Sequence, residues 1–216
     1  MEQTLPYKNT VVSWLNLFRL GATARGVLPF LLGGVIAWSQ GYPIDWPVLV
    51  ISTISVLLVM VMTFLVNEYN DYETDLLNKG YHRLSGGSRV LPMGLLSRQD
   101  SLIAAYVCMA CAGLSGLVLY FGFNTGPLTI PLGMLTIFIG YFYTAKPLRF
   151  SYNGLGEIAI WVSCGWLANS TGYYLQTGHF SNIVNLISLP GATSIFLVIL
   201  VNMPRSRVRS GWNNMI

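Results

Sequence analysis

The chain has 216 residues, of which 53% are hydrophobic and only 9% are charged, and its mean hydropathy is +0.56. This composition lies far outside that of soluble domains and predicts a polytopic membrane protein. A net charge of +4 would indicate a nucleic-acid partner only if the basic residues clustered on a soluble domain. They lie instead in short stretches between apolar runs, so we expect no nucleic-acid partner.

Apolar runs of about the length that a bilayer requires follow one another along the chain. The six predicted spans cover residues 17–39, 47–72, 101–121, 126–144, 154–175 and 182–204. Turn-forming residues separate them. Basic residues precede the first run, which predicts a transmembrane helix rather than a cleavable signal peptide. The expected fold class is an all-α bundle of six transmembrane spans.

The basic residues predict how these spans are oriented. With a cytoplasmic N-terminus, all twelve Lys and Arg residues lie on the cytoplasmic side: three before or near the start of the first span, four in the second connection, two in the fourth connection and three after the last span. This distribution satisfies the positive-inside rule without exception. We therefore expect a multi-pass protein of a bacterial or archaeal cytoplasmic membrane.

The second span ends in a run that carries four carboxylates within nine residues. Carboxylates are costly near a bilayer and usually mark function there. Asn67, Asp71 and Asp75 are successive i, i+4 neighbours on a helix and form one polar stripe. Oxygen ligands in such a stripe suit Mg²⁺ that is shared with a phosphate-bearing substrate. We predict all three as metal ligands and the two aspartates as catalytic residues, against the alternative of a solvated helix end.

Cations on the same side complete the predicted site. The loop after the second span contains Gly86 and Gly87, whose backbone can approach an anion, and Arg89, which can bind phosphate bidentately. Lys146 and Arg149 lie in the next cytoplasmic loop. Metal, cations and apolar helices together predict a prenyl diphosphate as ligand, with the three cations binding its diphosphate. The alternative for these cations is that they only determine topology.

The predicted chemistry is ionisation of an allylic C–O bond, followed by attack of an electron-rich acceptor on the allylic cation. Mg²⁺ and nearby cations stabilise the charge that develops on the departing diphosphate. Aromatic faces can stabilise the allylic cation, and Tyr72 and Tyr143 are candidates. Tyrosines also form belts at membrane interfaces, and this alternative stays open for both.

Several motifs resemble those of the UbiA-type membrane prenyltransferases, over about residues 14 to 204. They are the spacing Asn67-x3-Asp71-x3-Asp75, the loop Ser85-Gly86-Gly87-Ser88-Arg89, and the run Tyr143-Thr144-x-x-Pro147. Tyr174-Leu175-Gln176 resembles the branch that prenylates 1,4-dihydroxy-2-naphthoate in menaquinone synthesis. The resemblance implies a nine-helix bundle with a central cavity, a prenyl diphosphate and an aromatic acceptor as substrates, and two facing carboxylate motifs that bind Mg²⁺.

The C-terminal residues depart from the family pattern. The second carboxylate motif would begin at Asn202, but Arg205 stands where the family has an aspartate. We expect residues 1–16 to be a cytoplasmic segment, 17–204 an incomplete prenyltransferase domain and 205–216 an aberrant basic tail. A chain truncated in this way is expected to bind prenyl diphosphate weakly and to turn over slowly.

Two other functions stay open at this point. One is a catalytically inactive membrane remnant, and the other is a transporter-like protein with an acidic gate. Carboxylates in mid-membrane would favour the transporter, whereas these lie at the end of a span. Arg19 and Arg25 are expected to anchor the first span, with acceptor binding as the alternative.

Overall fold

The computed structural model describes residues 10–77 and 87–201, and their regular secondary structure is entirely helical. The segments are α1 (Thr10–Phe18), α2 (Leu20–Ser39), α3 (Trp46–Leu77), α4 (Arg98–Leu117), η1 (Val118–Gly122), α5 (Thr129–Phe142), α6 (Gly156–Ile160), η2 (Trp161–Leu167), α7 (Ala168–Thr177) and α8 (Asn182–Val201). The two η segments are π-helical. The prediction of an all-α fold is confirmed.

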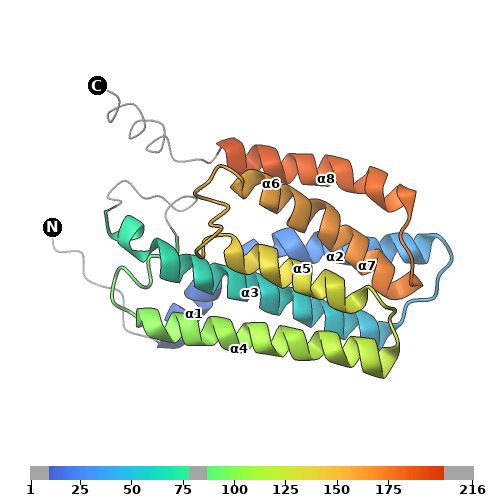
Figure 1. Cartoon of the computed structure of the whole chain (residues 1–216), viewed down its shortest axis with the longest axis horizontal. Helices are drawn as coiled ribbons and strands as arrows, with labels where there is room; N and C mark the ends of the chain where they lie inside the picture. Colours follow the sequence, from blue (N-terminus) through green and yellow to red (C-terminus); the bar gives the residue numbers. More distant parts are fainter. Residues whose placement is uncertain (1–9, 78–86, 202–216) are drawn as a thin grey trace.

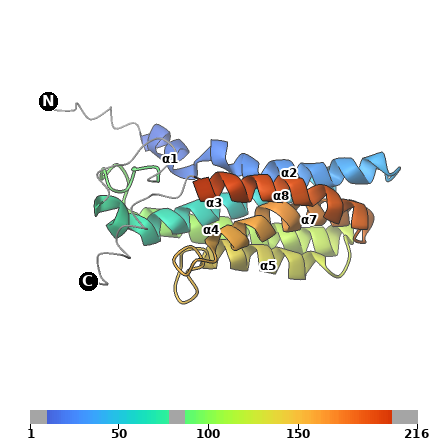
Figure 2. The ribbon, with the colours of Figure 1, turned by 90° about the horizontal axis from the view of Figure 1, so that it is seen from above.

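These segments join into six rods that run alternately in opposite directions (Figure 1). One rod is α1 with α2, another is α4 with η1, and a third is α6 with η2 and α7, while α3, α5 and α8 are single rods. The connections over 40–45, 123–128 and 178–181 are short, and short connections favour antiparallel neighbours. Viewed from above, the rods again lie roughly parallel to one common direction (Figure 2).

Three helical stretches of the described chain are long and apolar enough to cross a membrane, namely Thr10–Ser39, Trp46–Leu77 and Arg98–Gly122. Apolar helices over Thr129–Phe142 and Asn182–Leu197 are shorter. The order of the six rods follows the six predicted spans. The bundle therefore has the character of an all-α membrane protein.

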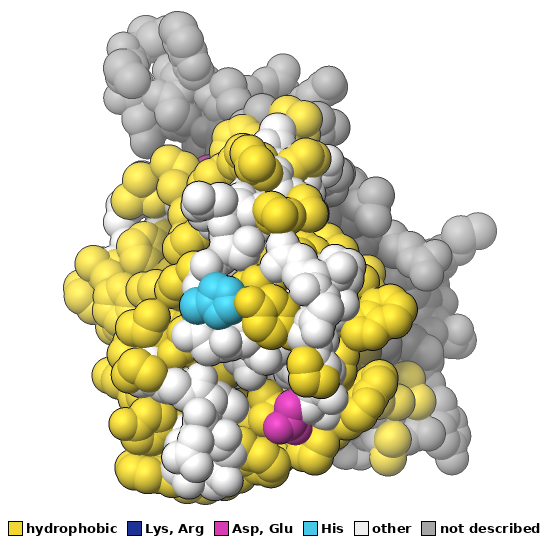
Figure 3. Space-filling view, turned by 90° about the vertical axis from the view of Figure 1, so that its right-hand side faces the viewer, with side chains coloured by type: hydrophobic (Ala, Val, Ile, Leu, Met, Phe, Trp, Pro, Cys, Tyr) yellow, Lys and Arg dark blue, Asp and Glu magenta, His cyan; other side chains and the backbone are white. Residues whose placement is uncertain are grey.

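The alternation of the rods separates two chemically different ends. Every basic residue that the structure describes lies toward the end where α3 finishes and α4 begins, in or beside the connections there or in the α1–α2 rod: Arg19, Arg25, Arg89, Arg98, Lys146 and Arg149. On the opposite end, Figure 3 shows a histidine and an acidic side chain among the described residues in view, but no Lys or Arg. The charge asymmetry expected from the sequence is thus present in three dimensions.

The central rod is α3, which contacts α1, α2, α4, α5 and α7. Its side chains Met62 and Leu65 are fully buried in the largest core cluster. Arg98, at the start of α4, donates from Nε to the carbonyl oxygen of Tyr69 at 3.0 Å and lies 4.4 Å above the ring of that tyrosine. This contact fixes the start of α4 against the polar end of α3.

Close contact between α2 and α7 depends on two glycines. A Cβ on Gly172 would overlap the carbonyl oxygen of Phe30, and one on Gly33 would overlap that of Asn169. Small residues matter at such contacts because lipid removes the hydrophobic driving force between helices and leaves packing as the main attraction. These glycines therefore set the separation of two walls of the cavity described below.

We predict that Gly172→Ala lowers the free energy of unfolding by about 2 kcal/mol, since the added methyl group meets backbone that cannot move aside easily. The matched control is Gly113→Ala in α4, where a Cβ meets nothing within 4 Å. That change should be neutral or stabilising by up to about 1 kcal/mol, because alanine is the better helix former. SDS titration in detergent micelles measures both, and equal effects would contradict the proposed packing.

Candidate functional site

A cavity of about 260 Å³ lies between α2, α3, α5, η2 and α7. Its lining on α3 extends from Val56 to Asn67, which is about 16 Å at the rise of an α-helix. Most of the lining is apolar, with Phe30, Met60 and Ile139 as examples. The cavity has the shape and lining expected for a hydrocarbon chain.

One end of this cavity is polar. Arg19, Asn67 and Tyr143 line it there, close to the ends of α3 and α5. Because α3 is continuous to Leu77, Asp71 and Asp75 continue the face of Asn67 over the next two turns. The apolar cavity and the predicted carboxylate stripe are therefore adjacent parts of one region.

The donor set of the stripe fits Mg²⁺ shared with a phosphate ligand. Within the described ranges, no three His, Cys, Asp or Glu side chains are grouped closely enough to hold a metal ion by themselves. Asp71, Asp75 and the amide oxygen of Asn67 instead offer a partial shell, and that oxygen is buried without a hydrogen-bond partner among the described residues. Mg²⁺ is commonly held by one or two carboxylates, with substrate phosphates and water as the remaining ligands.

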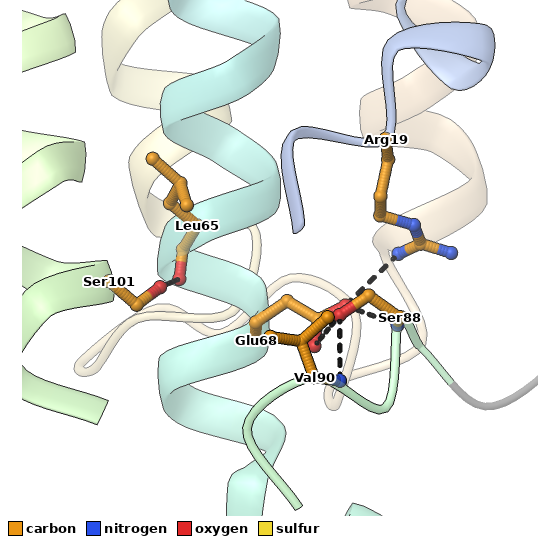
Figure 4. Close-up of polar contacts among 6 residues, drawn as sticks. All are labelled: Arg19, Leu65, Glu68, Ser88, Val90 and Ser101. Carbon is orange, nitrogen blue, oxygen red and sulfur yellow. Dashed lines mark hydrogen bonds and ion pairs between the residues drawn. The ribbon is translucent and has the colours of Figure 1, made fainter. Parts of the chain in front are cut away.

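Glu68 is part of this end, although it was not predicted as a site residue. The residue is only 2% exposed. Its carboxylate accepts hydrogen bonds from the backbone N–H of Ser88 at 2.6 Å and from the Ser88 hydroxyl at 2.9 Å, and it lies 3.8 Å from the Arg19 guanidinium (Figure 4). Glu68 precedes Asp71 by three residues and Asp75 by seven, which puts it on the same helix face as both. This spacing is the sequence signal by which Glu68 could have been predicted.

Gly87 shows how closely the following loop approaches the carboxylates. Its φ is +70°, and a Cβ there would lie 2.8 Å from Asp75 Oδ2 and 3.2 Å from Glu68 Oε1. A Cβ here would be strained by the backbone conformation and would force the Asp75 carboxylate to shift, and glycine avoids both costs. Arg89 follows two residues later, and its guanidinium donates to the backbone carbonyl oxygen of Asp75. The structure thus brings Arg89 to the stripe, while its predicted binding of diphosphate stays a prediction.

Three arginines at this end have left-handed backbone conformations. The φ values are 51° for Arg19, 62° for Arg89 and 43° for Arg149, and Asn124 is the remaining non-glycine residue of the described chain with positive φ. This conformation costs roughly 1–2 kcal/mol per residue and persists only where surrounding contacts impose it. Such strain is concentrated at binding and catalytic sites, which supports a functional assignment for this end of the bundle.

The connection between α5 and α6 contributes Arg149 and Tyr152. Tyr152 donates its hydroxyl hydrogen bond to Asp71, and the Arg149 guanidinium lies 4.6 Å from the centre of the Tyr152 ring. Burial, and then the hydrogen bond to Asp71, raise the pKa of Tyr152 above its usual value, so the phenol remains a donor at neutral pH. Tyr152 was not predicted, whereas Arg149 was. Lys146 lies in the same connection and is exposed.

The two predicted tyrosines occupy different environments. Tyr143 is among the residues that line the cavity at its polar end. Tyr72 packs against the core cluster shared with α4, and the Arg98 guanidinium lies 5.3 Å from its ring centre. The described lining of the cavity does not include Tyr72. The structure therefore brings Tyr143, but not Tyr72, to the cavity.

Residues 27–208 match the family model of the UbiA prenyltransferase family. The chain belongs to this family. It is 27% identical over 176 residues to the 1,4-dihydroxy-2-naphthoate octaprenyltransferase of Escherichia coli strain K12, a match that covers 76% of this chain and 53% of that protein. The resemblance inferred from the motifs is confirmed at the level of the family.

Two further relatives have related names. The 1,4-dihydroxy-2-naphthoate octaprenyltransferase of Bacillus subtilis strain 168 is 25% identical over 211 residues, covering 93% of this chain and 63% of that protein. The 2-carboxy-1,4-naphthoquinone phytyltransferase of Synechocystis is 24% identical over 168 residues, covering 78% of this chain and 52% of that protein. The chain thus spans between about half and two thirds of the length of these relatives. No solved structure matches it.

The approach of the loop to the carboxylates can be tested at Gly87. We predict that Gly87→Ala destabilises the protein by about 1–2 kcal/mol more than Gly94→Ala, because its Cβ meets Asp75 and Glu68. Gly94 is the matched control, since its φ is +68° and a Cβ there meets nothing within 4 Å. Both variants share the cost of a left-handed alanine, about 1 kcal/mol or slightly more. Equal losses in the unfolding free energy would contradict the close approach.

Proposed function

We propose that this chain binds a prenyl diphosphate and transfers its prenyl group to an aromatic acceptor, with 1,4-dihydroxy-2-naphthoate as the proposed acceptor. The observation that carries the proposal is an apolar cavity of about 260 Å³ adjacent to carboxylates and arginines at one end of the bundle. This pairing fits an amphiphile with a hydrocarbon tail and a polyanionic head. The names of the two octaprenyltransferase relatives support the choice of acceptor.

The diphosphate head would lie at the polar end. Asn67, Asp71 and Asp75 would hold Mg²⁺, which, when bound, would neutralise negative charge on the diphosphate and assist its departure. Arg89 donates a hydrogen bond to the Asp75 carbonyl oxygen. Arg149 lies beside the ring of Tyr152, whose hydroxyl group donates to Asp71. We assign both arginines to the phosphate oxygens, since guanidinium groups bind them bidentately. Exposed Lys146 would add positive charge at the entrance.

The reaction proceeds by heterolysis of the allylic C–O bond, with the electron pair leaving on the diphosphate. Arg89 and Arg149 stabilise that developing charge electrostatically. The face of Tyr143, at the polar end of the cavity, stabilises the allylic cation. An unsubstituted ring carbon of the acceptor then forms the new C–C bond, and its proton passes to the released diphosphate as the ring regains aromaticity. Tyr72 packs against α4 and has no role in this scheme.

We further propose that residues 17–204 form a transmembrane domain in the cytoplasmic membrane of a bacterium or archaeon, with the carboxylate end facing the cytoplasm. The positive-inside rule supports this orientation because the described basic residues are concentrated at that end. The diphosphate head of the substrate would then bind at the cytoplasmic side, while its prenyl tail remains in an apolar environment.

We predict that Asp71→Asn and Asp75→Asn each weaken binding of geranylgeranyl diphosphate at least about tenfold in the presence of Mg²⁺, because an anionic ligand of the cation is lost. Isothermal titration of the chain in lipid nanodiscs, with and without MgCl₂, measures the effect. The control is Glu73→Gln, an exposed carboxylate on the same helix that pairs with Arg98 at 3.4 Å. Parent-like, Mg²⁺-dependent binding by either aspartate variant would refute the metal assignment.

A second test probes the tail cavity through its own cysteine. Cys164 lines the cavity, whereas Cys111 is exposed on α4. In variants that retain only one of these cysteines, geranylgeranyl diphosphate with Mg²⁺ should slow N-ethylmaleimide modification of Cys164 and leave that of Cys111 unchanged. Mass spectrometry over a time course measures both rates. Unprotected Cys164 at saturating ligand would exclude the cavity as the tail site.

A further inference from the structure

We propose that Glu68 is a positioning residue that holds Arg89 and Arg19 at the diphosphate end of the cavity and is not itself a metal ligand. The identity of the diphosphate rests on the proposed function, whereas the contacts of Glu68 are independent of it. Glu68 lies in the same acidic run as Asp71 and Asp75, but its environment differs from theirs.

Both carboxylate oxygens of Glu68 are already engaged by protein donors. Oε1 accepts from the Ser88 backbone N–H at 2.6 Å and lies 3.8 Å from Arg19 Nη1, and Oε2 accepts from the Ser88 hydroxyl at 2.9 Å. The side chain is almost fully buried, so water does not compete for these bonds. A carboxylate committed in this way ties segments together and leaves cation binding to its neighbours.

The contact with Ser88 fixes the residues on both sides of Arg89. Ser88 Oγ also accepts from the Val90 N–H at 3.3 Å, and Val90 and Leu91 are each 2% exposed in the core (Figure 4). Arg89 is thus held between two anchored residues in a left-handed conformation that it would not adopt unaided. Its guanidinium is directed to the end of α3, where it contacts the carbonyl oxygen of Asp75.

Arg19 reaches Glu68 from a different part of the chain. It separates α1 from α2 with a φ of 51°, and its guanidinium lies 5.4 Å from the centre of the Phe64 ring and at the polar end of the cavity. Glu68 therefore connects the α1–α2 junction, α3 and the loop after residue 87 through one buried side chain. Without the charge of Glu68, Arg19 and Arg89 would lose the side chain that holds both of them at this end of the cavity.

The first measurement concerns the loop and requires no ligand. A spin label at Met93→Cys, with the native cysteines replaced by alanine, reports on the turn that follows Arg89, because the Met93 N–H donates to the Arg89 carbonyl oxygen at 3.0 Å. We expect Glu68→Gln to increase the mobility of the label and the control Glu73→Gln to leave it unchanged. Ser88→Ala removes the hydroxyl contact from the loop side and should shift mobility in the same direction. Unchanged mobility in Glu68→Gln and Ser88→Ala would overturn the positioning role.

The second measurement is a double-mutant cycle on geranylgeranyl diphosphate binding in nanodiscs with Mg²⁺. We expect Glu68→Gln and Arg89→Ala each to weaken binding about tenfold, in line with the loss of one charge-assisted contact. If Glu68 acts through Arg89 and Arg19, the double variant should lose clearly less than the roughly hundredfold that independent roles would give. Additive losses would overturn the inference. No binding by the parent chain would instead refute the proposed function and, with it, the diphosphate role of Glu68.

Discussion

The concentration of negative charge at the end of one membrane helix is the constraint on which the site depends. Glu68, Asp71 and Asp75 share a face of α3 and lie close enough to repel one another. Their neighbourhood is partly buried, where such repulsion is poorly screened. Arg19 and Arg89 supply positive charge that stabilises the carboxylate of Asp75. They come from segments that precede and follow α3 in the chain. The carboxylate face therefore organises the loops around it.

This organisation costs backbone strain. Arg19, Arg89 and Arg149 all adopt left-handed conformations, and Gly87 is required because a larger residue would collide with the carboxylates. The contacts that offset the strain are specific hydrogen bonds and ring contacts, each from a different connection. The apolar half of the site depends instead on helix packing, where glycines allow α2 and α7 to approach and form two walls of the cavity. The polar and apolar halves of the site thus rest on different interactions within one family fold.

The positions of single residues at this end were foreseeable from the sequence to different degrees. The i, i+4 stripe was predictable because helical periodicity is a local property, and Arg89 was predictable from the glycine-rich loop that carries it. Glu68 was not predicted, although its i+3 spacing to Asp71 and its i+7 spacing to Asp75 are visible in the sequence. Tyr152 had no such signal, because its contact with Asp71 joins residues 81 positions apart.

The sequence by itself determined the helical class, the order of the spans and the concentration of basic residues at one end, because apolar length, helical period and charge distribution are properties of short segments. Only the tertiary structure decided which carboxylate binds the loop, which tyrosine lines the cavity and how closely α2 approaches α7. Tyr72 and Tyr143 look alike in the sequence, and only packing against α4 or against the cavity distinguishes them. These features depend on contacts between segments that are distant along the chain, and local patterns do not specify such contacts.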